Sequence, residues 1–85
     1  MDLKKEIKRH VNKYGLKNFE LLGIHNTGKA LHVICALGPR RIGWWPNSRR
    51  KTVHIALPNG RNFSITNVTS PEKFISQLKD YADDI

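Results

Sequence analysis

Residues 52–66 read TVHIALPNGRNFSIT, and the alternation in this stretch decides how the chain folds. Two short runs of alternating apolar and polar residues flank Pro58, Asn59 and Gly60, three residues that favour turns. The stretch therefore predicts an antiparallel β-hairpin.

The register of this hairpin follows from which side chains must share a face. A turn made of Asn59 and Gly60 alone would place Ile55 opposite Ser64 and mix apolar with polar residues. A loop that also includes the preceding proline, with Gly60 in the left-handed region, places Ile55 opposite Phe63. Because a slip of one residue would exchange the two faces, we predict the second register, with one apolar and one polar face.

The flanking segments predict the rest of the fold. Apolar residues recur at helical spacing in residues 2–14 and 71–82, and residues 18–24 and 30–37 have the composition of strands. The expected order is helix, four strands, helix, in one domain spanning 1–85. We therefore expect an α+β fold: a single antiparallel sheet of about four strands, with the N- and C-terminal helices packed on one face.

The charge distribution of the chain is uneven. The formal net charge is +8 and the sequence pI is about 10.1. Between Leu21 and Pro71 there is no aspartate or glutamate, whereas seven cations lie there: Lys29, Arg40, Arg41, Arg49, Arg50, Lys51 and Arg61. Such a one-signed positive field favours a polyanionic partner.

The segment 38–51, GPRRIGWWPNSRRK, combines cations with both tryptophans of the protein. We expect it to form a long basic loop or wing, because its glycines and prolines discourage regular structure. Arginine binds phosphate or guanine through paired hydrogen bonds, and tryptophan stacks on bases. The candidate nucleic-acid-binding residues are Arg40, Arg41, Trp44, Trp45, Arg49, Arg50, Lys51 and Arg61. A small core needs large side chains, so we expect at least one tryptophan to pack on the sheet.

The first helix offers a second basic surface. Its polar face includes Lys5, Lys8 and Arg9, and like charges four residues apart disfavour an isolated helix. The pattern is compatible with contacts to an anion and also with an ordinary solvated face. We include these three residues among the candidate contacts.

Other chemistry is poorly supported by the sequence. Cys35 is the one cysteine, so no intramolecular disulfide can form, and it fits a buried apolar position. The histidines lack metal-site spacing, and no glycine-rich phosphate loop or serine nucleophile motif is present. We therefore expect no metal and no cofactor. No apolar run resembles a signal peptide or a membrane span, so we expect a cytoplasmic protein without membrane contact.

His54 is the candidate catalytic residue. In the predicted register it lies on the polar face of the hairpin, beside Ser64. A histidine on a basic surface can act as a general acid or base in RNA cleavage, with arginines holding the phosphate. The alternative is a half-exposed strand histidine that makes one hydrogen bond.

These observations favour a nucleic-acid-binding protein over an enzyme. Phosphate contacts would come from the basic loop and the first helix. DNA is favoured over RNA because a projecting basic wing suits a duplex groove, and the small size is that of a phage or mobile-element regulator. The alternatives are a metal-independent ribonuclease using His54 and a module that docks an acidic protein partner through tryptophan and arginine. The sequence does not predict the oligomeric state.

Overall fold

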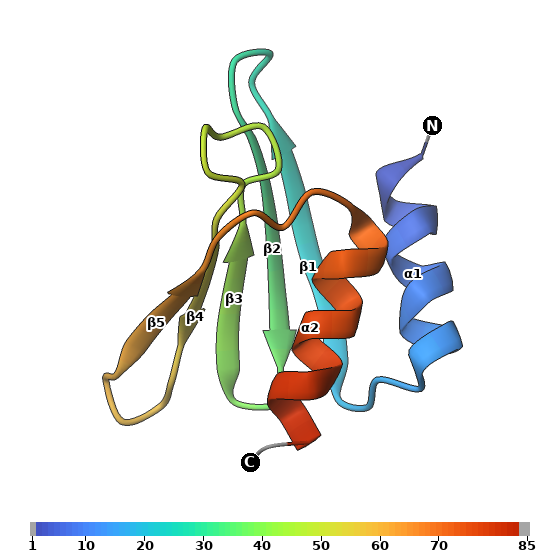
Figure 1. Ribbon diagram of the computed structural model, residues 1–85, viewed down its shortest axis with the longest axis vertical. Helices are drawn as coiled ribbons and strands as arrows, with labels where there is room; N and C mark the ends of the chain where they lie inside the picture. The colour runs from blue at the N-terminus through green and yellow to red at the C-terminus, as the bar shows by residue number, and fades with distance from the viewer. Residues whose placement is uncertain (1, 84–85) are drawn as a thin grey trace.

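The computed structural model describes residues 2–83 and has two helices and one sheet (Figure 1). The elements are α1 (Leu3–Tyr14), β1 (Phe19–Asn26), β2 (Leu31–Leu37), β3 (Arg40–Trp44), β4 (Val53–Ala56), β5 (Asn62–Ile65) and α2 (Pro71–Asp83). The predicted α+β class and the terminal helices are confirmed. The sheet has five strands rather than about four.

The sheet is antiparallel throughout, and its strands are neighbours in the order in which they follow along the chain. The predicted register of the β4–β5 hairpin is confirmed, with Ile55 opposite Phe63. Its loop closes through a hydrogen bond from Leu57 N to Arg61 O of 2.8 Å, and Gly60 has a φ of +85°. A glycine is favoured there because a side chain is strained in this left-handed conformation.

The fifth strand comes from the segment that the sequence predicted as a long loop or wing. Residues 38–51 are not one loop: Arg40–Trp44 form β3, which pairs with β2 on one side and β4 on the other. Gly38, with a φ of +61°, allows the tight turn before β3. The connection that remains, residues 45–52, is much shorter than expected. Local composition suggested a loop, but pairing with two strands satisfies the backbone of this segment on both sides.

The first hairpin carries an irregularity. β1 and β2 pair in one register up to Leu21 opposite Cys35, and the register shifts before Gly23. The extra residue is Leu22. Its side chain is 43% exposed, the highest value for a large apolar side chain within residues 2–83. Such a bulge lets the strand bend without disturbing the rest of the sheet.

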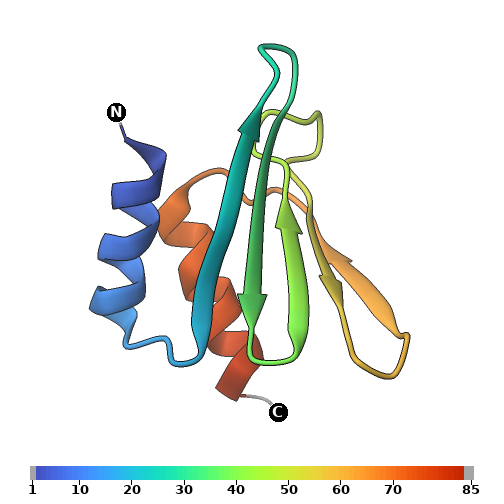
Figure 2. The same cartoon turned by 180° about the vertical axis from the view of Figure 1, so that it is seen from behind.

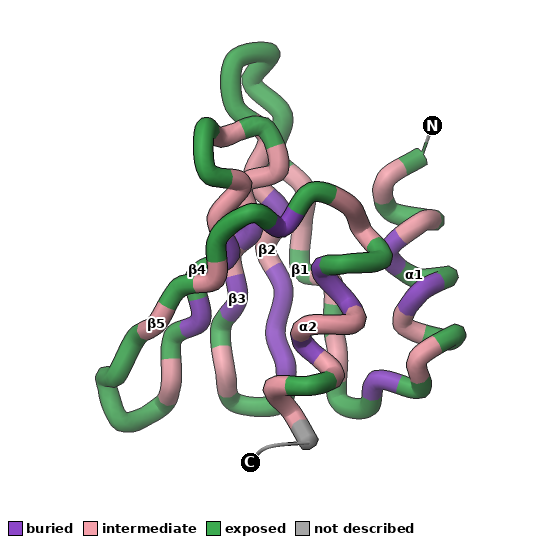
Figure 3. Tube along the Cα trace, viewed as in Figure 1, coloured by how far each residue is buried: buried purple, intermediate pink, exposed green. Residues whose placement is uncertain are grey.

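Both helices lie on one face of the sheet, where the core forms (Figure 1). Trp44 stacks on Phe74 of α2 with 4.6 Å between ring centroids, and its Nε1 donates to Val68 O at 3.1 Å. Cys35 is buried in the same core, as predicted. Buried residues concentrate in β2, β3, β4 and α2, whereas none of the described residues of β1 and β5 is buried (Figure 3).

The two helices also contact each other through polar groups. Glu72, in the first turn of α2, accepts hydrogen bonds from Lys13 Nζ at 3.1 Å and from the Tyr14 hydroxyl at 2.8 Å. The opposite face of the sheet is left without a helix, and Figure 2 shows this face in front of α2, with α1 beside β1. Neither helix within residues 2–83 combines the length and apolar character needed to cross a lipid bilayer.

Candidate functional site

The sheet face away from the helices, called the open face from here on, is built by alternate residues of the five strands. Side chains on one strand point alternately to the two faces, so the pairings identify the members. One row across the strands contains Gly23, Ile34, Gly43, His54 and Ser64. The next row, toward the β2–β3 turn, contains Glu20, Ala36, Arg41, Ala56 and Asn62.

Trp45 continues the open face directly after β3. Its indole stacks on the imidazole of His32, with 3.8 Å between ring centroids and 13° between ring planes. The ring of His54 lies 5.0 Å from the indole at a nearly perpendicular angle of 84°. Trp45 is half-buried, so this three-ring group is held against the sheet and is still accessible from solvent.

Gly43 makes this arrangement possible. A Cβ atom at position 43 would lie 2.9 Å from Cη2 and Cζ3 of Trp45 and 2.9 Å from Nε2 of His32. A Cβ atom does not make non-bonded contacts that short, so a side chain at position 43 would displace one of the two rings. A glycine within a strand often marks such a close approach. Gly43 was not among the predicted site residues, although an isolated glycine beside two tryptophans was a usable signal.

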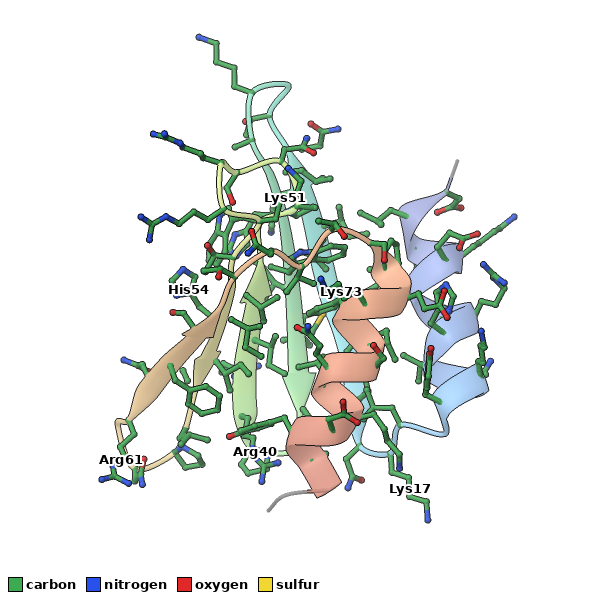
Figure 4. All side chains as sticks on the ribbon, viewed as in Figure 1. Lys17, Arg40, Lys51, His54, Arg61 and Lys73 are labelled. Atoms are coloured by element: carbon green, nitrogen blue, oxygen red, sulfur yellow. The ribbon has the colours of Figure 1, made fainter. Side chains whose placement is uncertain are left out.

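His54 lies on the open face, as predicted, and is exposed. Its Nδ1 is hydrogen-bonded to Ser64 Oγ at 3.0 Å, across the β4–β5 pair. This contact fixes the plane of the imidazole and directs Nε2 away from Ser64. Figure 4 labels His54 at the margin of the sheet, away from both helices.

The environment of His32 disfavours its protonated form. Partial burial against the sheet lowers the pKa of His32 below its ordinary value, and the nearby His25 and His54 lower it further. His25 is the direct cross-strand partner of His32. At neutral pH the stacked imidazole is therefore uncharged, and the stack with Trp45 is one between two neutral rings.

The two adjacent arginines of β3 lie on opposite faces. Arg41 is exposed on the open face, between Ala36 and Ala56. Arg40 points to the helix side, where its guanidinium lies 5.5 Å from the centre of the Tyr81 ring (Figure 4). The two arginines, both predicted to contact nucleic acid, therefore lie on different faces of the sheet.

The two adjacent tryptophans are separated in the same way. Trp44 is 1% exposed and lies in the core, so the prediction that it contacts nucleic acid is wrong. The expectation that at least one tryptophan packs on the sheet is confirmed. Strand geometry explains the difference, because consecutive residues of β3 must face opposite sides.

The remaining candidate cations flank the open face at its two ends. Arg49, Arg50 and Lys51 lie in the 45–52 loop, which is ordered by a Ser48 hydroxyl that donates to Trp45 O at 2.8 Å. Asn67 N and Val68 N also donate to this loop, to Arg50 O and Lys51 O. Arg61 lies at the opposite end of the sheet, in the β4–β5 turn (Figure 4).

The first-helix candidates lie elsewhere. Lys5, Lys8 and Arg9 are exposed on α1, which packs against α2 beside the edge strand β1, away from β3 and Trp45. Arg9 is paired with Glu6, with 2.7 Å between Nη2 and Oε2. The structure therefore does not bring these three residues together with the open face.

Metal and thiol chemistry finds no support in the described part of the chain. Among residues 2–83 no group of three or more His, Cys, Asp or Glu side chains could hold a metal ion. Burial raises the pKa of the Cys35 thiol to about 12, so this cysteine is not a nucleophile at neutral pH.

Of the carboxylates that the structure describes, the one on the open face is Glu20 in the edge strand β1. From β2 to β5 this face therefore carries histidine, tryptophan, arginine and amide groups without a negative charge. Comparison with known proteins finds no matching family model, no matching curated protein and no matching solved structure.

Proposed function

We propose that this protein binds nucleic acid through the open face of its sheet. The observation that carries the proposal is the half-buried Trp45, held between His32 and His54 on a face that has Arg41 and no carboxylate from β2 to β5. Arginine on such a face attracts phosphate, and aromatic rings offer surfaces for bases.

The distribution of cations supports a ligand that runs along the strands. Arg49 and Arg50 lie at one end of the sheet, Arg41 lies on its surface, and Arg61 lies at the other end. A chain of phosphates laid across the open face would meet positive charge at both ends and in the middle. The field is long-ranged and speeds association, although salt screens it.

The reason for favouring DNA over RNA, a wing that enters a duplex groove, no longer applies. That preference depended on a projecting basic wing, and β3 is instead paired within the sheet. The basic surface of α1 faces away from Trp45, so we restrict the proposed interface to the open face and its two ends.

The test is a titration of fluorescently labelled DNA and RNA oligonucleotides, followed by anisotropy at low and at physiological salt. We expect affinity that falls steeply as salt rises, because phosphate contacts release counterions. The matched pair is Arg41→Gln against Arg40→Gln, which remove the same charge from opposite faces. Arg41→Gln should weaken binding and lower the salt dependence by about one phosphate contact, whereas Arg40→Gln should leave both nearly unchanged.

Two results would contradict the proposal. Equal losses for the two variants would show that total charge rather than the open face determines binding. Failure to bind any oligonucleotide would favour the alternative of an acidic protein partner, for which Trp45 and Arg41 are suitable contact residues.

The hydrogen bond between His54 and Ser64 favours a second candidate, a metal-independent ribonuclease. An imidazole held in a fixed plane beside a phosphate-binding arginine has the arrangement that a general acid or base needs. His54→Ala would then abolish cleavage of RNA and leave RNA binding intact. Absence of cleavage by the unaltered protein would exclude this candidate.

A further inference from the structure

A shallow depression of about 380 Å³ lies on the open face. Its lining combines aromatic, small apolar and hydrogen-bonding groups. The lining residues that the argument uses are Trp45, His54, Gly43, Ala56, Arg41 and Asn62. No carboxylate contributes to it.

The floor of the depression is low because its central residues are small. Gly43 and Ala56 lie on the same face of neighbouring strands, two pairing positions apart. Gly43 has no side chain, and Ala56 contributes one methyl group. The rings of Trp45 and His32 occupy the space over Gly43. A flat ligand can therefore approach the backbone closely beside Ala56 of β4, next to these rings.

The two ends of the depression differ in chemistry. One end has the rings of Trp45 and His54, and the other has Arg41 and the amide of Asn62. Arg41 and Trp45 are four residues apart, or about 13 Å along extended chain. Both side chains border the same hollow, so one ligand can meet aromatic surface and a guanidinium at once.

We propose that the depression takes a single unstacked nucleobase, with the phosphate of the same nucleotide on Arg41. The ligand class is therefore single-stranded nucleic acid rather than intact duplex, and this inference rests on the function proposed above. The Asn62 amide supplies one donor and one acceptor group for the edge of the base. Backbone phosphates beyond this nucleotide extend toward the cations at the ends of the sheet.

Duplexes are disfavoured by the shape of the site. Stacking on a protein ring requires an exposed base face, and in a duplex the neighbouring base pairs cover both faces. Strand β3 does not protrude to enter a groove, because it is paired on both sides. Contact with a duplex would be limited to its phosphates.

The test compares single-stranded DNA, single-stranded RNA and duplex DNA of one sequence and one length. The variant Ala56→Leu fills the floor of the depression without changing charge, and Ala30→Leu is the matched control in the exposed β1–β2 turn. We expect Ala56→Leu to weaken single-strand binding by roughly five- to tenfold or more, the effect of losing one stacked base. Duplex binding should not change, and Ala30→Leu should affect neither ligand.

Gly43→Ala provides a second variant, because a methyl group there displaces Trp45 or His32. It should weaken single-strand binding and alter tryptophan fluorescence in the free protein. The DNA and RNA arms show whether the 2′-hydroxyl contributes.

The inference is overturned if duplex binds as tightly as single strands, or if Ala56→Leu leaves single-strand affinity unchanged; binding through the open face would then still stand on the Arg41 result. If no oligonucleotide binds, the inference and the proposed function both fail.

Discussion

The imidazole of His32 lies face to face with the indole of Trp45, at 3.8 Å between ring centroids. The contact joins β2 to the residue that follows β3, and Gly43 provides the space for both rings. It orders Trp45 in the free protein, so binding does not have to immobilise that side chain. Preorganisation of this kind increases affinity because less conformational freedom is lost on binding.

This stack makes stability depend on pH. The pKa of His32 is lowered in the folded protein, so the unfolded chain binds more protons below the ordinary value of 6.5. The stabilisation is present above pH 6.5 and is lost as the pH falls through the folded pKa. We expect His32→Phe, which retains an aromatic ring, to flatten the dependence of the unfolding midpoint on pH between 7 and 5. The check is denaturant unfolding across this range.

His25 and His54 also lower the pKa of His32. The corresponding control is His25→Phe, which removes a neighbouring imidazole and leaves the His32–Trp45 stack in place. An unchanged pH dependence in His32→Phe would show that the stack does not contribute to it.

The two tryptophans should differ sharply in their effect on stability. Trp44→Ala leaves a large cavity beside Phe74 and an unpaired Val68 carbonyl, and we expect it to cost about 3–5 kcal/mol of unfolding free energy. Trp45→Ala removes mainly ring contacts on the open face, worth about 1 kcal/mol. Urea unfolding of the two variants measures the difference. Similar losses would contradict the assignment of Trp44 to the core and Trp45 to the surface.

Cys35 should be unreactive in the folded protein. It is fully buried, and its thiol pKa of about 12 leaves roughly one thiolate in ten thousand at pH 8. We expect a thiol reagent such as Ellman's reagent to react at a rate set by unfolding, and to react rapidly once denaturant is added. Fast labelling without denaturant would mean that β2 opens to solvent in the native state.

The contact between the helices should be visible in the titration of Glu72. Hydrogen bonds from Tyr14 and then from Lys13 lower the pKa of this carboxyl group. Its stabilising contribution is therefore present above the ordinary value of 4.5 and is lost as the pH falls through the folded pKa. We expect Tyr14→Phe and Lys13→Met each to raise the pKa of Glu72, measured by NMR. An unchanged pKa in either variant would show that the corresponding hydrogen bond does not act on Glu72.

Much of the fold was predictable because the period of the hydrophobic pattern identifies both element and face. The β4–β5 register followed from keeping Ile55 and Phe63 on one side, and the terminal helices followed from their apolar stripes. Strand β3 was not predictable from composition, because Gly43 and the flanking glycine and prolines resemble a loop. Its pairing with two distant segments provides stabilisation that no local signal contains.

The candidate site was predictable in part. His54 beside Ser64 follows from the hairpin register, and Trp45 and Arg41 were among the expected contacts. The sequence did not show that Arg41 and Trp45 face the open side while Arg40 and Trp44 face the helices. This division follows only once the segment is known to be a strand. Once β3 is assigned, alternation alone separates the members of each pair.

The doubled residues of β3 also determine how the protein tolerates changes in length. Arg40–Arg41 and Trp44–Trp45 are divided between the two faces by strand alternation alone. Deleting Ile42 would bring Arg41 to the helix side if the pairing of the later residues were kept, or Trp44 to the open face if the pairing of the earlier residues were kept. An insertion or deletion of one residue within β3 therefore exchanges interior and surface chemistry together, whereas the turns at either end of the strand can change length without that exchange.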